Sequence, residues 1–228
     1  MVVADLEIEL VQKAIKNIHL AVYPPTGRVR LAAPEDVNAE TLRLFVLSKL
    51  PWIRRQQRKF ANQSRQSPRL YVNRETHYYL GKKYLLRVHE IDHPYRTPKV
   101  LIKTKTYIEL YVKESTSTEQ KAIVMKEWYR LVLKQLLDEL VPKWEKLIGV
   151  SVNQFSVKIM KTKWGSCNTD KGKILFNLEL AKKSHACIEY VVAHELVHLI
   201  ERKHNVKFKN ILDKHLPKWR TLKSELNY

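Results

Sequence analysis

Residues 184–208 read SHACIEYVVAHELVHLIERKHNVKF, and this stretch decides what the C-terminal part of the chain can be. Ser184 is a good N-cap, and the apolar residues that follow it recur at helical spacing. Within the helix, His194, Glu195 and His198 form an HExxH pattern. At about 100° per residue, the two histidines lie about 40° apart on one face and about 6 Å apart along the axis. Both imidazoles can therefore reach one metal ion at about 2.0–2.1 Å.

Glu195 is one step round the helix from the two histidines. This is a poor place for a ligand, but it is close enough to touch a water molecule on the ion. It is the position of a general base in metal-assisted hydrolysis. The pattern therefore predicts a metal-dependent hydrolase with His194 and His198 as ligands and Glu195 as the catalytic residue.

A third ligand is expected from the residues after the pattern. His204 is the leading candidate, but on an unbroken helix it would lie about 9 Å beyond His198 and about 120° away from it. We therefore expect the helix to end near Arg202 and the chain to turn back. Asn205 is suited to such a turn because asparagine tolerates the left-handed conformation.

Two carboxylates compete with His204 for that role. Glu201 falls on the same helix face as both histidines, although it lies about 10 Å beyond His194 along the axis. A glutamate on a later helix, such as Glu225, is the other alternative.

The segment before this helix predicts a β-hairpin. The residues VNQFSVKIMKTKWGSC (152–167) lead into the turn NTDKG, and KILFNLEL (173–180) returns. Gly172 is the turn residue. A hairpin beside the metal helix can offer its outer strand to an extended peptide.

Several side chains of this hairpin are candidate substrate contacts. The motif residues among them are Trp164, Gly165, Ser166 and Asn177. The lysines that could hold phosphate groups are Lys161, Lys163, Lys171 and Lys173. Ser166 and Cys167 are not expected to act as nucleophiles, because no base is spaced to activate them.

The rest of the chain predicts an α+β fold. Strand-like runs flank the turn Pro24-Pro25-Thr26-Gly27. A helix is expected over 38–63, and Pro51 is expected to kink or split it. Two further hairpins follow within 76–112, and a polar segment, KESTSTEQ (113–120), precedes a long helix that ends near Ile148. The metal helix is expected over 187–203, and a short helical piece broken at Pro217 closes the chain. No internal repeat is evident.

Composition bounds the class of protein. The chain has 228 residues with 44% hydrophobic and 29% charged residues, which indicates a globular protein. Two cysteines make no disulfide framework. The acidic N-terminus does not resemble a secretory signal, and no apolar run is long enough to span a membrane. A cytoplasmic protein without a membrane partner is expected.

The formal charge of +19 predicts an anionic partner or substrate. The densest basic run is WIRRQQRKF (52–60), and its candidate nucleic-acid contacts are Arg54, Arg55, Arg58 and Lys59. The run extends toward Arg65, Arg69 and Arg74. The aromatic residues interleaved with it, Trp52, Phe60 and Tyr71, either stack on bases or belong to the core.

Three stretches, KTKWGSCNTDKGKILFNLEL, IEYVVAHELVHLIERKHNVKF and LPKWRTLKSELN, together resemble the YgjP-like (SprT-related) family of predicted metal-dependent hydrolases. The resemblance is strong over 155–228 and weaker over the LGKKY hairpin and the long helix. It implies that His194, His198 and His204 hold zinc and that Glu195 is catalytic. Trp164, Gly165, Ser166, Cys167 and Asn177 match the family's other motif positions. Lys209 departs from the family, which often has tryptophan there.

The polar segment 113–120 marks the expected boundary between a β-rich N-terminal region over 1–113 and a hydrolase domain over 114–228, which the resemblance implies is zincin-like. One Zn²⁺ per chain is expected, with other divalent metals open. The leading hypothesis is a zinc metallopeptidase. One alternative is a nucleoside triphosphate (UTP) pyrophosphatase on the same metal site, an activity assigned within the family. SprT-like relatives act on proteins attached to DNA, which suits the positive charge and the peptidase hypothesis. A second alternative is a nucleic-acid-binding module, because the basic run 52–60 and its extension are interleaved with aromatic residues.

Overall fold

The computed structural model describes residues 1–23, 26–62, 69–91 and 97–226, except the side chains of Lys59 and Asn62. The turn prolines Pro24 and Pro25 and the basic residue Arg65 lie outside these residues. The chain divides into two compact units, Met1–Pro68 and Arg69–Tyr228. No helix of the described part is long and apolar enough to cross a membrane.

The division between the units lies at 68/69, whereas the sequence predicts one at 113/114. The strands between these two points belong with the C-terminal half, because they share one hydrophobic core with it. Leu86, Ile108 and Leu110 are buried in the same cluster as Leu133 and Leu196. A polar segment in the sequence therefore marks the start of a helix rather than a boundary between cores.

The first unit is a four-stranded sheet with one helix. Its strands are β1 (Val2–Val3), β2 (Leu6–Gln12), β3 (His19–Tyr23) and β4 (Arg28–Ala33), in the order β1-β2-β4-β3. β3 and β4 form the predicted hairpin, whereas β1 and β2 are strands that the sequence pattern did not predict. The helix α1 (Ala39–Asn62) runs through Pro51 without interruption, so the expected split at this proline does not occur. The unit's core lies between sheet and helix, where Val29, Leu31, Leu42 and Val46 are buried.

The second unit opens with a sheet of the same topology. Its strands are β5 (Thr76–Tyr79), β6 (Lys82–Glu90), β7 (Lys99–Ile102) and β8 (Tyr107–Val112), in the order β5-β6-β8-β7. In both sheets the second and fourth strands pair in parallel, the other pairs are antiparallel, and a helix follows. The two units therefore share a β-β-β-β-α topology that the sequence analysis did not predict.

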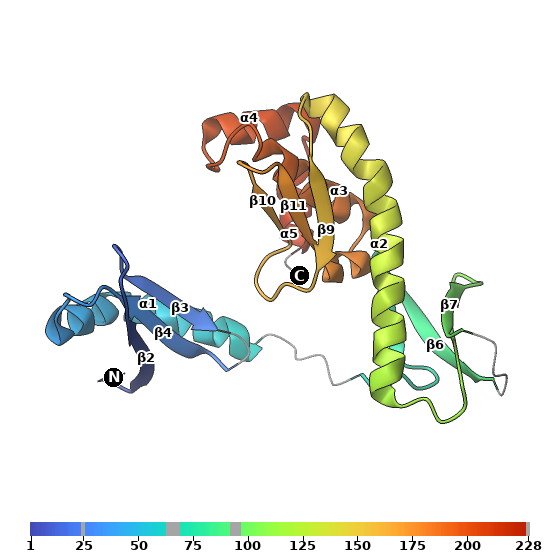
Figure 1. Cartoon of the computed structure of the whole chain (residues 1–228), viewed down its shortest axis with the longest axis horizontal. Coiled ribbons are helices and arrows are strands. Elements are labelled where there is room, and N and C mark those ends of the chain that lie inside the picture. The colour runs from blue at the N-terminus through green and yellow to red at the C-terminus, as the bar shows by residue number, and fades with distance from the viewer. Residues whose placement is uncertain (24–25, 63–68, 92–96, 227–228) are drawn as a thin grey trace. The chain divides into compact units, whose positions relative to one another are not determined.

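A long helix, α2 (Thr118–Ile148), connects this sheet to the rest of the second unit (Figure 1). A capping box between Ser117 and Gln120 starts it, and Gly149 ends it in the left-handed conformation. One face of α2 buries Leu133, Leu137, Val141 and Trp144 among other residues. The last third of the chain therefore packs against α2.

The last third combines a small sheet with three helices. The strands β9 (Gln154–Lys158), β10 (Gly165–Asn168) and β11 (Lys173–Asn177) lie in the order β10-β11-β9. β10 and β11 form the predicted hairpin with Gly172 at a positive φ, and β9 joins β11 in parallel. The helical elements are η1 (Leu178–Lys182), α3 (His185–Val197), α4 (Val206–His215) and α5 (Trp219–Leu226).

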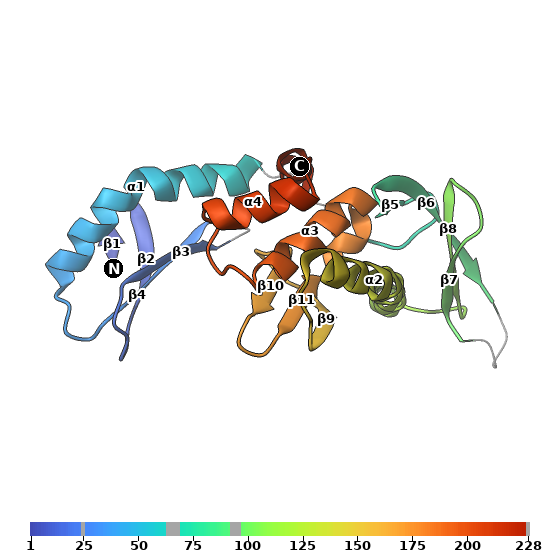
Figure 2. The ribbon, with the colours of Figure 1, turned by 90° about the horizontal axis from the view of Figure 1, so that it is seen from above.

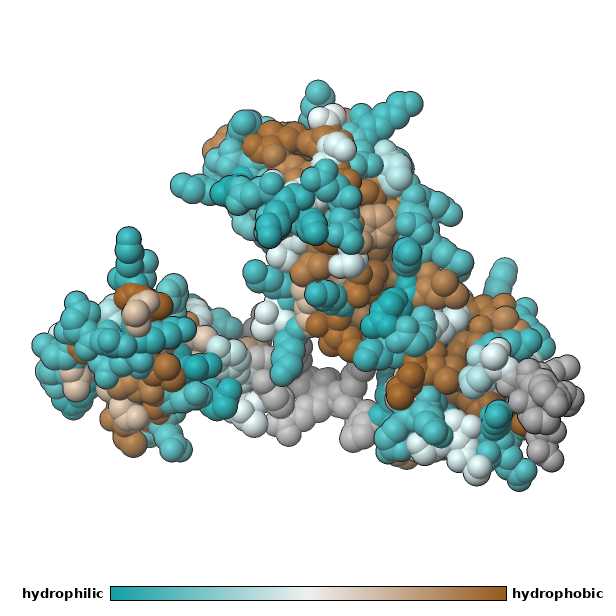
Figure 3. All heavy atoms as spheres, in the orientation of Figure 1, coloured by the Kyte–Doolittle hydropathy of each residue, from teal (hydrophilic) through white to brown (hydrophobic). Residues whose placement is uncertain are grey.

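Helix α3 lies at the centre of this assembly, between the small sheet and α2, with α4 and α5 beside it (Figures 1 and 2). Nine of its residues are buried, so it is apolar nearly all round, which is typical of a central helix. In the space-filling view of Figure 3, hydrophilic residues cover much of the visible face, and hydrophobic residues are scattered among them. The HExxH pattern is thus carried by the most deeply buried helix of the second unit.

Candidate metal centre and active site

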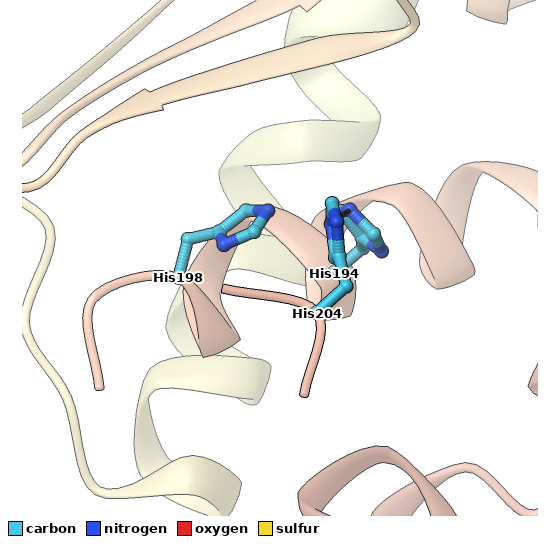
Figure 4. A group of neighbouring side chains, drawn as sticks. All are labelled: His194, His198 and His204. Carbon is cyan, nitrogen blue, oxygen red and sulfur yellow. Dashed lines mark hydrogen bonds between the residues drawn. The ribbon is translucent and has the colours of Figure 1, made fainter. Parts of the chain in front are cut away.

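The structure brings His194, His198 and His204 together at the end of α3 and in the turn that follows it (Figure 4). The ligating nitrogen atoms of the three imidazoles all lie within 4.8 Å of one another. The Nε2 atoms of His194 and His204 are 3.0 Å apart. Two nitrogens that bind one ion at about 2.0–2.1 Å in a tetrahedral arrangement are separated by little more than this. The geometry therefore fits one shared metal ion.

The chain turns back earlier than the sequence predicts. Helix α3 ends at Val197 rather than near Arg202, and His198 is its C-cap. The amides of Leu199 and Ile200 donate to carbonyls three residues before them, which tightens the chain into short turns. This early end places His204 beside His194 rather than on the far side of a longer helix.

Asn205 has a different role from the one expected. Its φ of −81° and ψ of −169° are extended, so the left-handed turn predicted at this position is wrong. Its side-chain oxygen instead accepts a hydrogen bond from the amide of Phe208 and caps α4. A new helix start, rather than a left-handed residue, sets the direction of the chain after His204.

The two rival carboxylates lie outside this cluster. One Oε atom of Glu201 accepts from the amide of Lys203, and this hydrogen bond is the main cause that lowers the pKa of Glu201. Glu225 accepts from the hydroxyl of Ser184 at 2.9 Å. Among the described residues, the group of three possible ligands contains only the histidines.

The non-ligating nitrogens of two histidines have partners that orient the rings. Nδ1 of His198 donates to the backbone carbonyl of Glu201 at 3.2 Å, which leaves the Nε2 lone pair for a metal ion. The hydroxyl oxygen of Tyr190 lies 3.4 Å from Nδ1 of His194. Tyr190 is buried, and its ring stacks on Trp219. Sequence analysis did not single out Tyr190, although it precedes His194 by one helical turn on the same face.

Phe208 forms the floor of the cluster. Its ring centroid lies 5.0 Å from that of His194 and 4.8 Å from those of His198 and His204. It is buried, and it belongs to α4. The start of α4 therefore supports all three rings from one side. The next residue, Lys209, is exposed, so the departure from the family at that position does not touch this contact.

Burial keeps the imidazoles in the form that binds metals. Desolvation lowers the pKa of His194 to about 3, and His198 and His204 contribute by charge repulsion. Desolvation also lowers the pKa of His198. Near neutral pH both rings are neutral, and a neutral imidazole is the ligating form. The donor set therefore suits a borderline metal ion such as Zn²⁺.

Glu195 is a carboxylate held almost completely out of water. Its exposed fraction is 5%, and desolvation raises its pKa to about 7, while the charge of Lys163 opposes the increase. Its neighbour across the interface with β10 is Gly165. A carboxyl group with a pKa near 7 can both accept and release a proton at neutral pH.

A cleft of about 840 Å³ opens over the histidines and Glu195. Strand β10 and the residues around it form one wall, and α3 forms another. Arg202 and Asp170 form an exposed ion pair at its rim, joining the turn after α3 to the turn of the hairpin. The lining residues are Lys163, Trp164, Gly165, Ser166, Cys167, Asn168, Thr169, Asp170, Tyr190, Val191, His194, Glu195, His198, Arg202, His204, Lys223 and Leu226.

The predicted substrate contacts separate into two groups. Trp164, Gly165, Ser166 and Lys163 line the cleft, whereas Lys161, Lys171 and Lys173 are exposed residues outside its lining. Arg202, Lys223 and Asp170 were missed, because nothing in the sequence shows which surface charges the turns bring to the rim.

Asn177 also lies outside the lining of the cleft. It is buried, and its amide donates to the carbonyls of Met160 and Lys163, both at 2.8 Å. Its oxygen accepts from the amides of Met160 and Glu179. Both the nitrogen and the oxygen of the Asn177 side chain are engaged in hydrogen bonds that hold the loop leading into β10. The structure therefore gives Asn177 a positioning role rather than a substrate contact.

Cys167 is unsuited to nucleophilic catalysis. Desolvation, with a smaller contribution from Glu195, raises the pKa of its thiol to about 11. The thiolate is therefore scarce at neutral pH.

The basic run of α1 is only partly available to an anionic partner. Arg54 pairs with Asp5 at 2.8 Å, while Arg55 and Arg58 are exposed. The side chain of Lys59 lies outside the described part of the structure. Trp52 packs against the core of the first unit and Tyr71 against that of the second, as core aromatics do.

Comparison with known proteins agrees with this geometry. The model of the family described as YgjP-like, metallopeptidase domain, matches residues 16–228. A search of the curated proteins gives no match.

Two solved structures share part of the fold. The metallopeptidase zymogen abylysin of Pyrococcus abyssi is 16% identical with a TM-score of 0.38, over 40% of this chain and 90% of its own. The zymogen jannalysin of Methanocaldococcus jannaschii is 20% identical with a TM-score of 0.36, over 40% of this chain and 92% of its own. Neither likeness is close enough to add to the family match. That match covers the three histidines, Glu195 and the hairpin, and this chain therefore belongs to the YgjP-like metallopeptidase domain family.

Proposed function

We propose that this chain is a zinc-dependent peptidase in which His194, His198 and His204 hold the metal and Glu195 is the general base. The observation that carries the proposal is the convergence of three imidazoles and one buried carboxylate in a single cleft. A Zn²⁺ ion bound there supplies Lewis-acid activation of a water molecule and of the scissile carbonyl.

Glu195 accepts the proton from the attacking water and later delivers it to the departing amine. A pKa near 7 suits both transfers, because the group then changes its protonation state at little cost near neutral pH. The low exposure of Glu195 keeps bulk water from competing with the proton transfer.

The small sheet offers a place for the peptide. β10 is at the end of the strand order β10-β11-β9, and its residues line the cleft. An extended peptide can add to this edge by backbone hydrogen bonds, which select for conformation more than for sequence. We therefore expect unfolded or extended segments to be better substrates than folded proteins.

Hydrolysis of nucleoside triphosphates remains the alternative function for the same site. Of the lysines that suggested it, Lys163 lines the cleft, whereas Lys161 and Lys173 do not. The other basic residues of the lining are Arg202, which is paired with Asp170, and Lys223, so the cluster of hairpin lysines that suggested phosphate binding is not assembled around the cleft.

The test measures two reactions on zinc-loaded full-length protein. The first is cleavage of an unfolded protein, and the second is release of pyrophosphate from each nucleoside triphosphate. Glu195→Gln is the matched variant, because it keeps the size of the side chain and removes its basicity. We expect proteolysis by the wild type and a loss of about 100-fold or more in the variant.

Three outcomes separate the hypotheses. Proteolysis that survives in Glu195→Gln removes Glu195 from the general-base role. Pyrophosphate release that disappears in the variant, without proteolysis, replaces the peptidase with the nucleotide hydrolase. Neither reaction in zinc-loaded wild type contradicts the proposal.

A further inference from the structure

Gly165 of the WGSC motif is packed directly against Glu195. A Cβ atom built on Gly165 would lie 2.5 Å from Oε1, 2.6 Å from Cγ and 2.7 Å from Cδ of Glu195. These separations are far below van der Waals contact. The three nearest atoms all belong to Glu195, and none belongs to a histidine of the metal cluster.

Glycine is required at position 165 because a larger residue would not fit, and not because the backbone conformation demands it. Gly27, Gly81, Gly149 and Gly172 have positive φ angles, which favour glycine, but Gly165 does not. Gly165 is the first residue of β10 and is paired with Phe176 of β11. Any residue could adopt its backbone angles, so the side chain of Glu195 is what excludes them.

Neither β10 nor α3 can move easily to relieve a clash between position 165 and Glu195. The amide of Asn177 donates to the carbonyl of Trp164, and its side chain fixes the loop that enters β10. On the other side, α3 is capped by Ser184 and buried on most of its surface. The remaining way to relieve a clash is to displace the carboxylate of Glu195.

We propose that Gly165 is a positioning residue that sets the place of the Glu195 carboxylate over the metal site. The bare glycine lets the side chain lie flat against β10, with its oxygens at the bottom of the cleft. A methyl group at this position meets Glu195 before any other residue and displaces the base. The effect on activity rests on the proposed function, whereas the packing relationship between the two residues does not.

The activity experiment uses Gly165→Ala in the zinc-loaded full chain. We expect about one zinc per chain, as in wild type, a KM for the peptide within about threefold, and a kcat lower by about 10- to 100-fold. Gly149→Ala is the matched control. It makes the same substitution at a left-handed glycine whose Cβ would meet nothing within 4 Å. It is expected to lower the melting temperature but to leave kcat unchanged.

A double-mutant cycle tests the packing without any activity. Gly165→Ala should lower the melting temperature of wild type by about 2–8 °C, because it overfills a close-packed contact. In the Glu195→Ala background the clashing atoms are gone, so the same substitution should cost much less. Such a cycle measures the interaction energy between residues 165 and 195.

The outcomes are distinguishable. If Gly165→Ala costs the same in both backgrounds, or leaves kcat at the wild-type value while proteolysis is present, the inference is wrong. If wild type has no peptidase activity but the two substitutions are strongly coupled, the proposed function fails while the contact between Gly165 and Glu195 is upheld. Loss of zinc from Gly165→Ala would also overturn the inference, because it would show that the metal cluster itself is disturbed.

Discussion

The Nε2 atoms of His194 and His204 are 3.0 Å apart, although one residue is on α3 and the other is in the turn before α4. This proximity depends on α3 ending at Val197. It means that the turn of 198–205, and not the HExxH helix alone, completes the candidate metal site.

His204→Ala should therefore remove the third ligand and weaken zinc binding by more than about 100-fold, a larger loss than changes to supporting residues produce. Competition against a chromogenic chelator measures the affinity. Glu201→Gln and Glu225→Gln are the matched controls and should bind zinc as wild type does, because both carboxylates are engaged elsewhere. Strong binding by His204→Ala, with loss in either control, would move the third ligand to that carboxylate.

Tyr190→Phe should weaken zinc binding by about tenfold, because the hydroxyl near Nδ1 of His194 helps to hold that ring in its ligating orientation. The same chelator competition gives the affinity. The phenyl ring keeps the stacking on Trp219, so the melting temperature of the metal-free protein should change little. An unchanged zinc affinity would show that the hydroxyl plays no part in orienting His194.

Asn177→Ala should lower the free energy of unfolding by about 1–3 kcal/mol, because it removes the hydrogen bonds that this buried side chain donates to the carbonyls of Met160 and Lys163. Urea denaturation measures this loss. Asn153→Ala removes an exposed hydrogen bond to the carbonyl of Lys171 in the same hairpin region and should cost less. Equal losses in the two variants would argue against a special role for the Asn177 clamp.

His77 gives the stability of the protein a specific dependence on pH. Desolvation lowers its pKa from 6.5 to about 4, against the opposing charge of Glu75, which lies 3.0 Å away. The unfolded chain then binds more protons than the folded one between about pH 6.5 and 4, so acidification through this range reduces stability.

The measurement compares wild type with His77→Gln by urea denaturation at several pH values. The difference in free energy of unfolding between them should change in favour of the variant as the pH falls from 6.5 to 4, and it should be constant above pH 7. A difference that stays the same throughout this range would mean that His77 does not titrate as its burial implies.

The exposed arginines of α1 lead to a prediction about partners. If this helix contacts nucleic acid, Arg55→Glu/Arg58→Glu should reduce the slope of log K against log salt concentration by about 2, since each phosphate contact contributes about 0.9 for duplex DNA. Arg43→Glu on the same helix, where arginine already pairs with Glu40, is the control. No binding of DNA by wild type at low salt would exclude this partner.

Local patterns in the sequence determined many of the secondary-structure elements and the first two metal-ligand candidates. The spacing of His194 and His198 predicted two imidazoles that can reach one ion, and their ligating nitrogens lie within 4.8 Å of each other. Ser184 as a cap, Gly172 in the hairpin turn and the extent of α2 also follow from neighbouring residues. Such features are encoded within a few turns of chain, where propensity and periodicity are informative.

Tertiary structure decided the features that depend on residues far apart in the chain. The end of α3, the position of His204 and the floor made by Phe208 follow from how α4 packs against α3. The pairing of Gly165 with Glu195, the use of Asn177 as a clamp and the repeated β-β-β-β-α topology could not be predicted from periodicity. The physical reason is that spacing along a helix or strand fixes the direction of a side chain, whereas its neighbours, and hence its exposure and pKa, are fixed only when distant elements pack together.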